Sequence, residues 1–165
     1  MRNTKLNRDL EGAIKQWVSD SGVTFDYAVT LTSPDTYRDR QDASRKVRYF
    51  LNRLNRELLR HRYKRLGECV AIFPTIESKN RKMHVHAAIR CPVGISVGAF
   101  KSAIRECWKA AHEGVDFAIV DIRPMHSIDW IGYICKETAI GNIDAIDIAN
   151  ISWGNRSTAN IAANA

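Results

Sequence analysis

Apolar residues follow two different spacings along this chain. In four segments they recur every three or four residues, as Leu10, Ile14 and Val18 do, which is the spacing of one buried helix face. In four other segments they alternate with polar residues or run together, which predicts strands. The predicted helices span residues 6–19, 38–63, 97–111 and 128–138, and the predicted strands span residues 25–32, 69–76, 83–89 and 115–122.

The order of these segments is a helix, then β-α-β-β-α-β, then a helix. That order is typical of the α+β ferredoxin-like or split βαβ arrangement, which is also RRM-like: an antiparallel sheet with helices packed on one face. The other face of the sheet is then open for a ligand. Pro74 lies in the first strand of the central hairpin, which predicts an edge position or a bulge, because proline cannot donate to the ladder.

Length and composition indicate one globular domain. The chain has 165 residues, of which 45% are apolar and 26% are charged, and it shows no internal repeat. We expect the domain to span residues 1–154, with one more short helix or edge strand around residues 143–148. Residues 155–165 are small and polar, and we expect them to form a flexible tail.

The sequence also predicts a compartment. No apolar run approaches the length of a membrane span, and the N-terminus lacks the apolar core of a signal peptide. The four cysteines show no CxxC spacing and lie within apolar segments, where a free cysteine behaves as a small hydrophobe. We therefore expect a reduced, cytoplasmic protein without a membrane partner.

Positive charge is concentrated in one predicted helix. The chain carries a net charge of +7, yet the segment 38–65 alone holds eleven Lys and Arg residues against three acidic residues, a balance of +8. A basic stripe of this kind suits a polyanion such as nucleic acid. The alternative is that these side chains are simply the solvated face of a helix.

The central hairpin carries the first candidate chemistry. Side chains alternate along a strand, so His84 and His86 point to one face and Val85 to the other. Directly opposite residues of paired strands have Cβ atoms roughly 5 Å apart. If Glu77 pairs with His84, two imidazoles and one carboxylate converge, which is a plausible divalent-metal site. The alternative is a pair of histidines that face water.

The last predicted helix carries a second candidate group. Tyr133 and Lys136 are three residues apart and share a helix face, as Tyr133 and Glu137 do. A phenol needs activation to act as a nucleophile, and a nearby ammonium group favours its phenolate and can neutralise phosphate charge. The alternative is a half-buried pair on the surface of the helix.

These residues, in this order, resemble the motifs of the HUH endonucleases. A strand ending Thr30-Leu31-Thr32 comes first, then Glu77 upstream of His84-Val85-His86, and then Tyr133 and Lys136 on a helix. The order and the lone tyrosine on that helix resemble the single-tyrosine rolling-circle replication initiator (Rep) proteins. Relaxases and single-strand transposases are relatives of these proteins.

The resemblance implies a mechanism. His84 and His86, with Glu77 as the third ligand, would hold Mn²⁺ or Mg²⁺, which polarises the scissile phosphate of single-stranded DNA. Tyr133 would attack that phosphate to give a 5′-phosphotyrosine intermediate and a free 3′-hydroxyl, and Lys136 would assist by its charge. Reversal of the step rejoins strands, so the enzyme would be both nickase and ligase at the start of rolling-circle DNA replication.

The same resemblance implies further contacts. Glu137 competes with Glu77 for the role of third ligand. Lys79, Arg81 and Lys82 at the hairpin tip, together with Thr32, are candidates for binding DNA that carries an adjacent hairpin or origin duplex. The chain has no nucleotide-binding P-loop, so a replication helicase is a possible partner, unless a longer chain carries one. The host would be a bacterium or another cell that carries the mobile element.

Three other hypotheses fit parts of the pattern. The chain could be a single-strand transposase or a relaxase-like protein of the same superfamily. It could be a non-catalytic, RRM-like nucleic-acid-binding module, although such modules carry exposed aromatics where this hairpin has histidines. It could also be a zinc hydrolase that forms no covalent intermediate.

Overall fold

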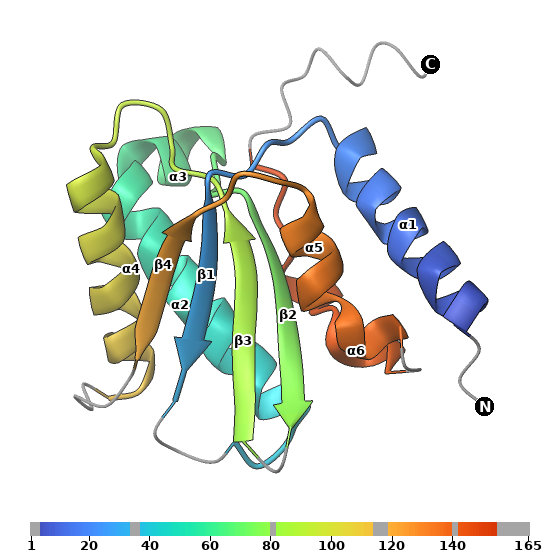
Figure 1. The fold of residues 1–165 in the computed structure, drawn as a ribbon. Coiled ribbons are helices and arrows are strands. Elements are labelled where there is room, and N and C mark those ends of the chain that lie inside the picture. Colours follow the sequence, from blue (N-terminus) through green and yellow to red (C-terminus); the bar gives the residue numbers. More distant parts are fainter. Residues whose placement is uncertain (1–3, 34–36, 80–81, 114–118, 140–141, 155–165) are drawn as a thin grey trace.

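The computed structural model describes residues 4–33, 37–79, 82–113, 119–139 and 142–154. Four strands and a set of helices make up this part of the chain (Figure 1). The strands are β1 (Tyr27–Thr32), β2 (Ile72–Lys79), β3 (Lys82–Ile89) and β4 (Val120–Pro124). The helices are α1 (Thr4–Asp20), α2 (Arg40–Leu59), α3 (His61–Leu66), α4 (Val97–Ala111), α5 (Asp129–Ile134) and α6 (Lys136–Ala139), with the 3₁₀ turns η1 (Ile143–Ala145) and η2 (Ile148–Asn150).

The strands form one antiparallel sheet in the order β2-β3-β1-β4. The two central strands are therefore β3 and β1, and the crossover helices α2 and α4 each join a central strand to an edge strand. This connectivity confirms the predicted split βαβ arrangement. Pro74 lies in β2, an edge strand, where the missing N–H group costs no hydrogen bond in the sheet.

The main core lies between the sheet and the two crossover helices. Val29, Val85 and Ala87 point to this face and pack against fully buried residues of α2 and α4 such as Phe50 and Ile104. Figure 1 shows α2 and α4 on one side of the sheet, as the sequence predicted. The apolar stripes of α2 and α4 thus form one side of the main core, and the sheet forms the other.

The opposite face of the sheet is covered in part, where the sequence suggested an open face. Ile14 and Val18 of α1 and Ile131 of α5 pack against Phe73 and Ala88 in a second core. Figure 1 shows α5, α6 and α1 at the β2 end of the sheet, away from β4. The uncovered part of this face is therefore the part formed by β1, β4 and the end of the hairpin.

Two predicted helices are interrupted. The basic helix ends as α2 at Leu59, because Arg60 has φ +48° and ψ −115°, and the chain restarts as α3. The last predicted helix is divided at Cys135 into α5 and α6. Helical periodicity alone does not reveal either break, since the apolar positions continue on both sides.

The segment after α6 caps the edge of the sheet. Its two 3₁₀ turns are accompanied by isolated bridges from Ile146 to Thr75 and from Ser152 to Ile72. The Asp147 N–H donates to the Pro74 carbonyl at 3.1 Å. The sequence left open whether this segment is a short helix or an edge strand, and it combines short helical turns with strand-like bridges. It covers the edge of β2. The predicted tail of residues 155–165 lies outside the described residues.

Trp108 of α4 is fully buried in the main core, and its indole N–H donates to the Thr32 carbonyl at 2.9 Å. We expect Trp108→Ala to lower the free energy of unfolding by about 3–5 kcal/mol, because it leaves a cavity and an unpaired carbonyl. Urea denaturation followed by circular dichroism measures the loss. Trp17→Ala is the control, since Trp17 is 42% exposed; equal losses in the two variants would contradict this placement of Trp108.

The cysteines are free thiols in two environments. Cys107 and Cys135 are buried, and burial raises their pKa values to about 11 and about 12. Cys69 and Cys91 are half-buried. We expect a thiol reagent such as Ellman's reagent to modify Cys69 and Cys91 in the native protein and all four cysteines only after unfolding. Rapid modification of Cys135 in the native state would contradict the packing of α5 on the second core.

No helix in the described part of the chain has the length and apolar character needed to cross a membrane.

Candidate active site

The face of the sheet opposite α2 and α4 presents rows of side chains whose neighbours follow from the strand register. Glu77 of β2 lies opposite His84 of β3, as predicted, and His84 in turn lies opposite Thr32 of β1. The next row on this face runs from Thr75 through His86 to Thr30 and Asp121. The two strands extend further than the sequence predicted, to Lys79 and Lys82.

His86 is held by hydrogen bonds at both ring nitrogens. Its Nε2 lies 2.8 Å from Oε2 of Glu77, and its Nδ1 lies 3.1 Å from the Thr30 hydroxyl. An ionised carboxylate only accepts hydrogen bonds, so we assign the proton to Nε2, and Nδ1 then accepts from Thr30. His86 and Glu77 are each only 8% exposed. The ring orientation is therefore fixed by three strands of the sheet.

Helices α5 and α6 bring Tyr133 and Lys136 next to Glu77 and His86. Lys136 Nζ lies 3.1 Å from Oε1 of Glu77 and 4.4 Å from the centroid of the Tyr133 ring. The Tyr133 ring lies 6.4 Å from the His86 ring, centroid to centroid. Tyr133 and Lys136 thus share one face, as the sequence predicted, although the helix breaks between them.

Helix α1 positions α5 and with it Tyr133. Ile14 packs against Ile131 in the second core, and Lys15 forms an ion pair with Asp129 at 3.0 Å. The ion pair is exposed and contributes little to stability, so the apolar contact is what fixes the two helices. At Gly132 an added Cβ would meet the ends of the Glu11 and Lys15 side chains of α1, which would have to move. Helix α1 therefore lies directly against α5 one residue before the tyrosine.

Trp130 and Thr30 are site residues to which sequence reasoning assigned no specific role. The Trp130 ring stacks on that of Tyr133, with centroids 5.1 Å apart and planes at 22°, and its edge meets His86 at 6.1 Å. Its indole N–H donates to the Ala87 carbonyl at 3.4 Å. Trp130 lies three residues before Tyr133, and this helical spacing is the signal that could have identified it.

Glu77, His86 and Lys136 are titratable groups in contact, and they shift one another's pKa values. Burial disfavours the ionised form of Glu77, but the hydrogen bonds from Lys136 and His86 outweigh it, so the pKa of this carboxyl lies below its usual value. Burial lowers the pKa of His86 despite the opposing pull of Glu77, so its imidazole is neutral at pH 7. Burial also acts against the ammonium of Lys136, yet its contact with Glu77 raises the pKa of that group.

The donor set of the hairpin fits a divalent metal ion in its chemistry. His84, His86 and Glu77 offer two imidazoles and a carboxylate from one sheet face, which transition-metal ions accept. In the arrangement described, Glu77 contacts His86 and Lys136 instead. Over the described ranges no three His, Cys, Asp or Glu side chains are grouped as a metal site. The ammonium of Lys136 is therefore the cation that compensates Glu77 in this arrangement.

Glu137, the alternative third ligand, makes different contacts. It lies on α6, accepts a hydrogen bond from the Asn142 side chain at 3.0 Å and interacts electrostatically with Arg40. Glu77, in contrast, contacts His86 directly. The geometry therefore favours Glu77 as the partner of the histidines.

The structure describes only part of the predicted DNA-binding residues. The backbones of Lys79 and Lys82 pair at the end of the hairpin, and Arg81 lies outside the described residues. Thr32 faces His84 and donates its hydroxyl to the Ile119 carbonyl at 3.1 Å. The basic helix α2 packs on the face opposite the histidines, so it cannot hold the phosphates nearest to Tyr133.

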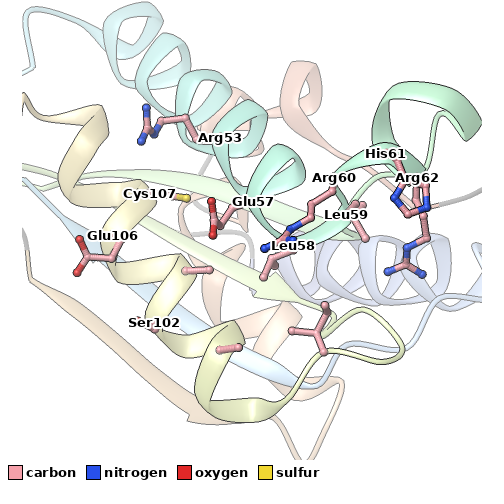
Figure 2. Close-up of a pocket in the computed structure, with 13 residues that line it drawn as sticks. Arg53, Glu57, Leu58, Leu59, Arg60, His61, Arg62, Ser102, Glu106 and Cys107 are labelled. Carbon is pink, nitrogen blue, oxygen red and sulfur yellow. The ribbon is translucent and has the colours of Figure 1, made fainter.

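Two hollows of similar size lie on different layers of the molecule. The one in Figure 2 has a volume of about 580 Å³ and lies among α2, α3 and α4, where Arg53, Arg60 and Arg62 are interspersed with Glu57 and Glu106. It contains none of the hairpin or α5 residues described above. The other has a volume of about 610 Å³ and is lined by His86 and Tyr133. We assign the candidate site to the second hollow, because His86 and Tyr133 both line it.

No known protein family matches the chain, and no curated protein or solved structure does either.

Proposed function

We propose that the protein is a metal-dependent endonuclease of the HUH type, which nicks and rejoins single-stranded DNA through Tyr133 at the start of rolling-circle replication. The observation that carries the proposal is the meeting of Tyr133 and Lys136 with Glu77 and His86. These residues come from a helix and a hairpin about fifty residues apart in the sequence. Such a convergence of a nucleophile with titratable groups is what a catalytic centre requires.

The chemical step is a transesterification at phosphorus. The Tyr133 oxygen forms a bond to the scissile phosphorus, and the bond from phosphorus to the 3′-oxygen of the preceding nucleotide breaks. The phenolic proton is lost, and the leaving 3′-oxygen takes up a proton, so a 5′-phosphotyrosine and a 3′-hydroxyl result. The reverse step restores the strand without any external energy source, because one phosphodiester replaces another.

Lys136 and the hairpin supply the electrostatic part of the proposal. The ammonium of Lys136 lies over the Tyr133 ring, where its charge reduces the repulsion between the site and an approaching phosphate. When bound by His84, His86 and Glu77, Mn²⁺ or Mg²⁺ would polarise the phosphoryl oxygen. Thr30 and the sheet hold His86 in place for this role.

The proposed substrate is single-stranded DNA beside a DNA hairpin or an origin duplex. We expect the end of the protein's β2–β3 hairpin to lie near that duplex. A chain of this kind would act in the cytoplasm of a bacterium or of a host cell that carries a mobile element. A replication helicase is a possible partner for extended unwinding. The single tyrosine after the histidines favours an initiator over a relaxase, as the resemblance implies.

A nicking assay with hairpin-bearing single strands tests the proposal. We expect cleavage and a covalently shifted protein band with Mn²⁺, a weaker reaction with Mg²⁺, and no reaction in EDTA. Mn²⁺ is expected to act better because imidazole ligands suit it more than they suit Mg²⁺. Cleavage that persists in EDTA would contradict the proposal. Binding without cleavage under every divalent ion would favour the RRM-like binding module instead.

A further inference from the structure

The hollow beside His86 and Tyr133 is larger than the reacting groups need. Its volume of about 610 Å³ lies within the range of about 300–1,000 Å³ typical of ligand sites. The floor is β1, where Ala28 and Thr30 present small side chains between larger neighbours. One wall is α5 and the other is β4 with the loop that follows it. Space of this kind next to a scissile phosphate can hold part of the substrate.

The α5 wall offers an aromatic surface. Trp130 and Tyr133 stack on each other and both line the hollow. Bases of single strands stack on such side chains whatever their sequence, because every base has a π face. A base that leaves the stack of its neighbours can therefore stack on Trp130 instead.

The β4 wall offers hydrogen-bonding groups of both kinds. Asp121 and Arg123 are two residues apart, so both point to the face that carries His86, and Arg123 Nε donates to Asp121 Oδ2 at 2.8 Å. The pair is exposed and adds little stability. Oδ1 of Asp121 and the two terminal amino groups of Arg123 make no hydrogen bond among the described residues. The pair thus presents an acceptor beside a set of donors.

We propose that this hollow binds one unstacked base of the single strand next to the cleaved phosphate, and that Asp121 and Arg123 select guanine there. The inference rests on the proposed function, which supplies single-stranded DNA to this face. Guanine presents two adjacent donors, N1–H and the N2 amino group, to a carboxylate. It also presents two adjacent acceptors, O6 and N7, to a guanidinium group. No other DNA base presents both adjacent pairs.

Equilibrium binding tests this inference independently of cleavage. The probe is a fluorescent oligothymidine strand with one central guanine, compared with strands that carry adenine, cytosine or thymine at that position. The protein is the Tyr133→Phe variant in EDTA, so that no strand is cut. We expect about tenfold tighter binding of the guanine strand, the discrimination typical of a good bidentate contact. Equal affinity for the four strands would overturn the inference.

Three variants test which residues cause the preference for guanine. Asp121→Asn and Arg123→Ala should each remove most of the preference for guanine, whereas Arg105→Ala on α4 should keep it while removing the same charge. Loss of the preference in the Arg105 variant alone would overturn the assignment to β4. Inosine in place of guanine should lose part of the advantage, because it lacks the N2 amino group.

The outcomes separate this inference from the proposed function. Metal-dependent cleavage of all four strands by the wild-type protein, with no guanine preference in binding, would overturn the inference and leave the proposed function intact. A guanine preference that depends on Asp121, in a wild-type protein that cleaves no strand, would support the base site and count against the nuclease. A protein that binds no single strand would overturn both.

Discussion

Tyr133→Phe is expected to abolish covalent attachment to DNA and to slow strand cleavage by roughly a thousandfold or more, since the variant lacks the proposed nucleophile. Tyr133 is 52% exposed, so the variant should keep its fold and thermal stability. Its ring still stacks on Trp130 and still lies beneath Lys136. The loss should therefore appear in the rate of cleavage and not in the affinity for the strand.

The matched control is Tyr49→Phe. Tyr49 lies on α2, on the opposite side of the sheet, and is 49% exposed, so the two substitutions remove the same group at similar exposure. We expect the Tyr49 variant to cleave and attach DNA like the wild-type protein. Undiminished attachment in the Tyr133 variant would refute the assignment of the nucleophile.

Glu77→Gln is expected to have the second large effect. The carboxylate of Glu77 joins His86 to Lys136, and glutamine keeps its size while removing its charge. We expect the affinity for Mn²⁺ to fall by roughly 100-fold, with a parallel loss of cleavage, because a proposed ligand and the partner of two titratable groups are lost together. Isothermal titration calorimetry with Mn²⁺ measures this affinity directly.

Glu137→Gln is the comparison for this variant. Glu137 contacts Asn142, and we expect its substitution to leave Mn²⁺ affinity close to that of the wild-type protein. The opposite pattern, with weak Mn²⁺ binding in the Glu137 variant and normal binding in the Glu77 variant, would assign the third ligand to α6. The two variants therefore decide between the carboxylates that the sequence left as alternatives.

Local patterns in the sequence predicted much of the sheet and its register. Alternation placed His84 and His86 on one face, and the short hairpin set Glu77 opposite His84. The boundaries of α4 also agree, because Ser96 caps the helix and accepts from the Ala99 N–H. These features depend on residues close together in the sequence, where geometry leaves few choices.

Long-range packing was harder to predict. The apolar stripe of α1 shows that one face is buried, but not that it packs on α5 and covers part of the second sheet face. The contact of Lys136 with Glu77 likewise depends on how α6 follows the break at Cys135. The hydrogen bond from Thr30 to His86 depends on the pairing of β1 with β3, which the element order implies only in outline.

The most direct test of the central claim is the mass of the covalent product. After reaction with a single-stranded oligonucleotide and Mn²⁺, the protein is digested with protease and nuclease, and its peptides are analysed by mass spectrometry. We predict a nucleotide linked through its 5′-phosphate to the peptide that contains Tyr133, and to no other tyrosine peptide. Cleavage of the strand with every tyrosine peptide unmodified would contradict the claim, as would a nucleotide attached at a different tyrosine.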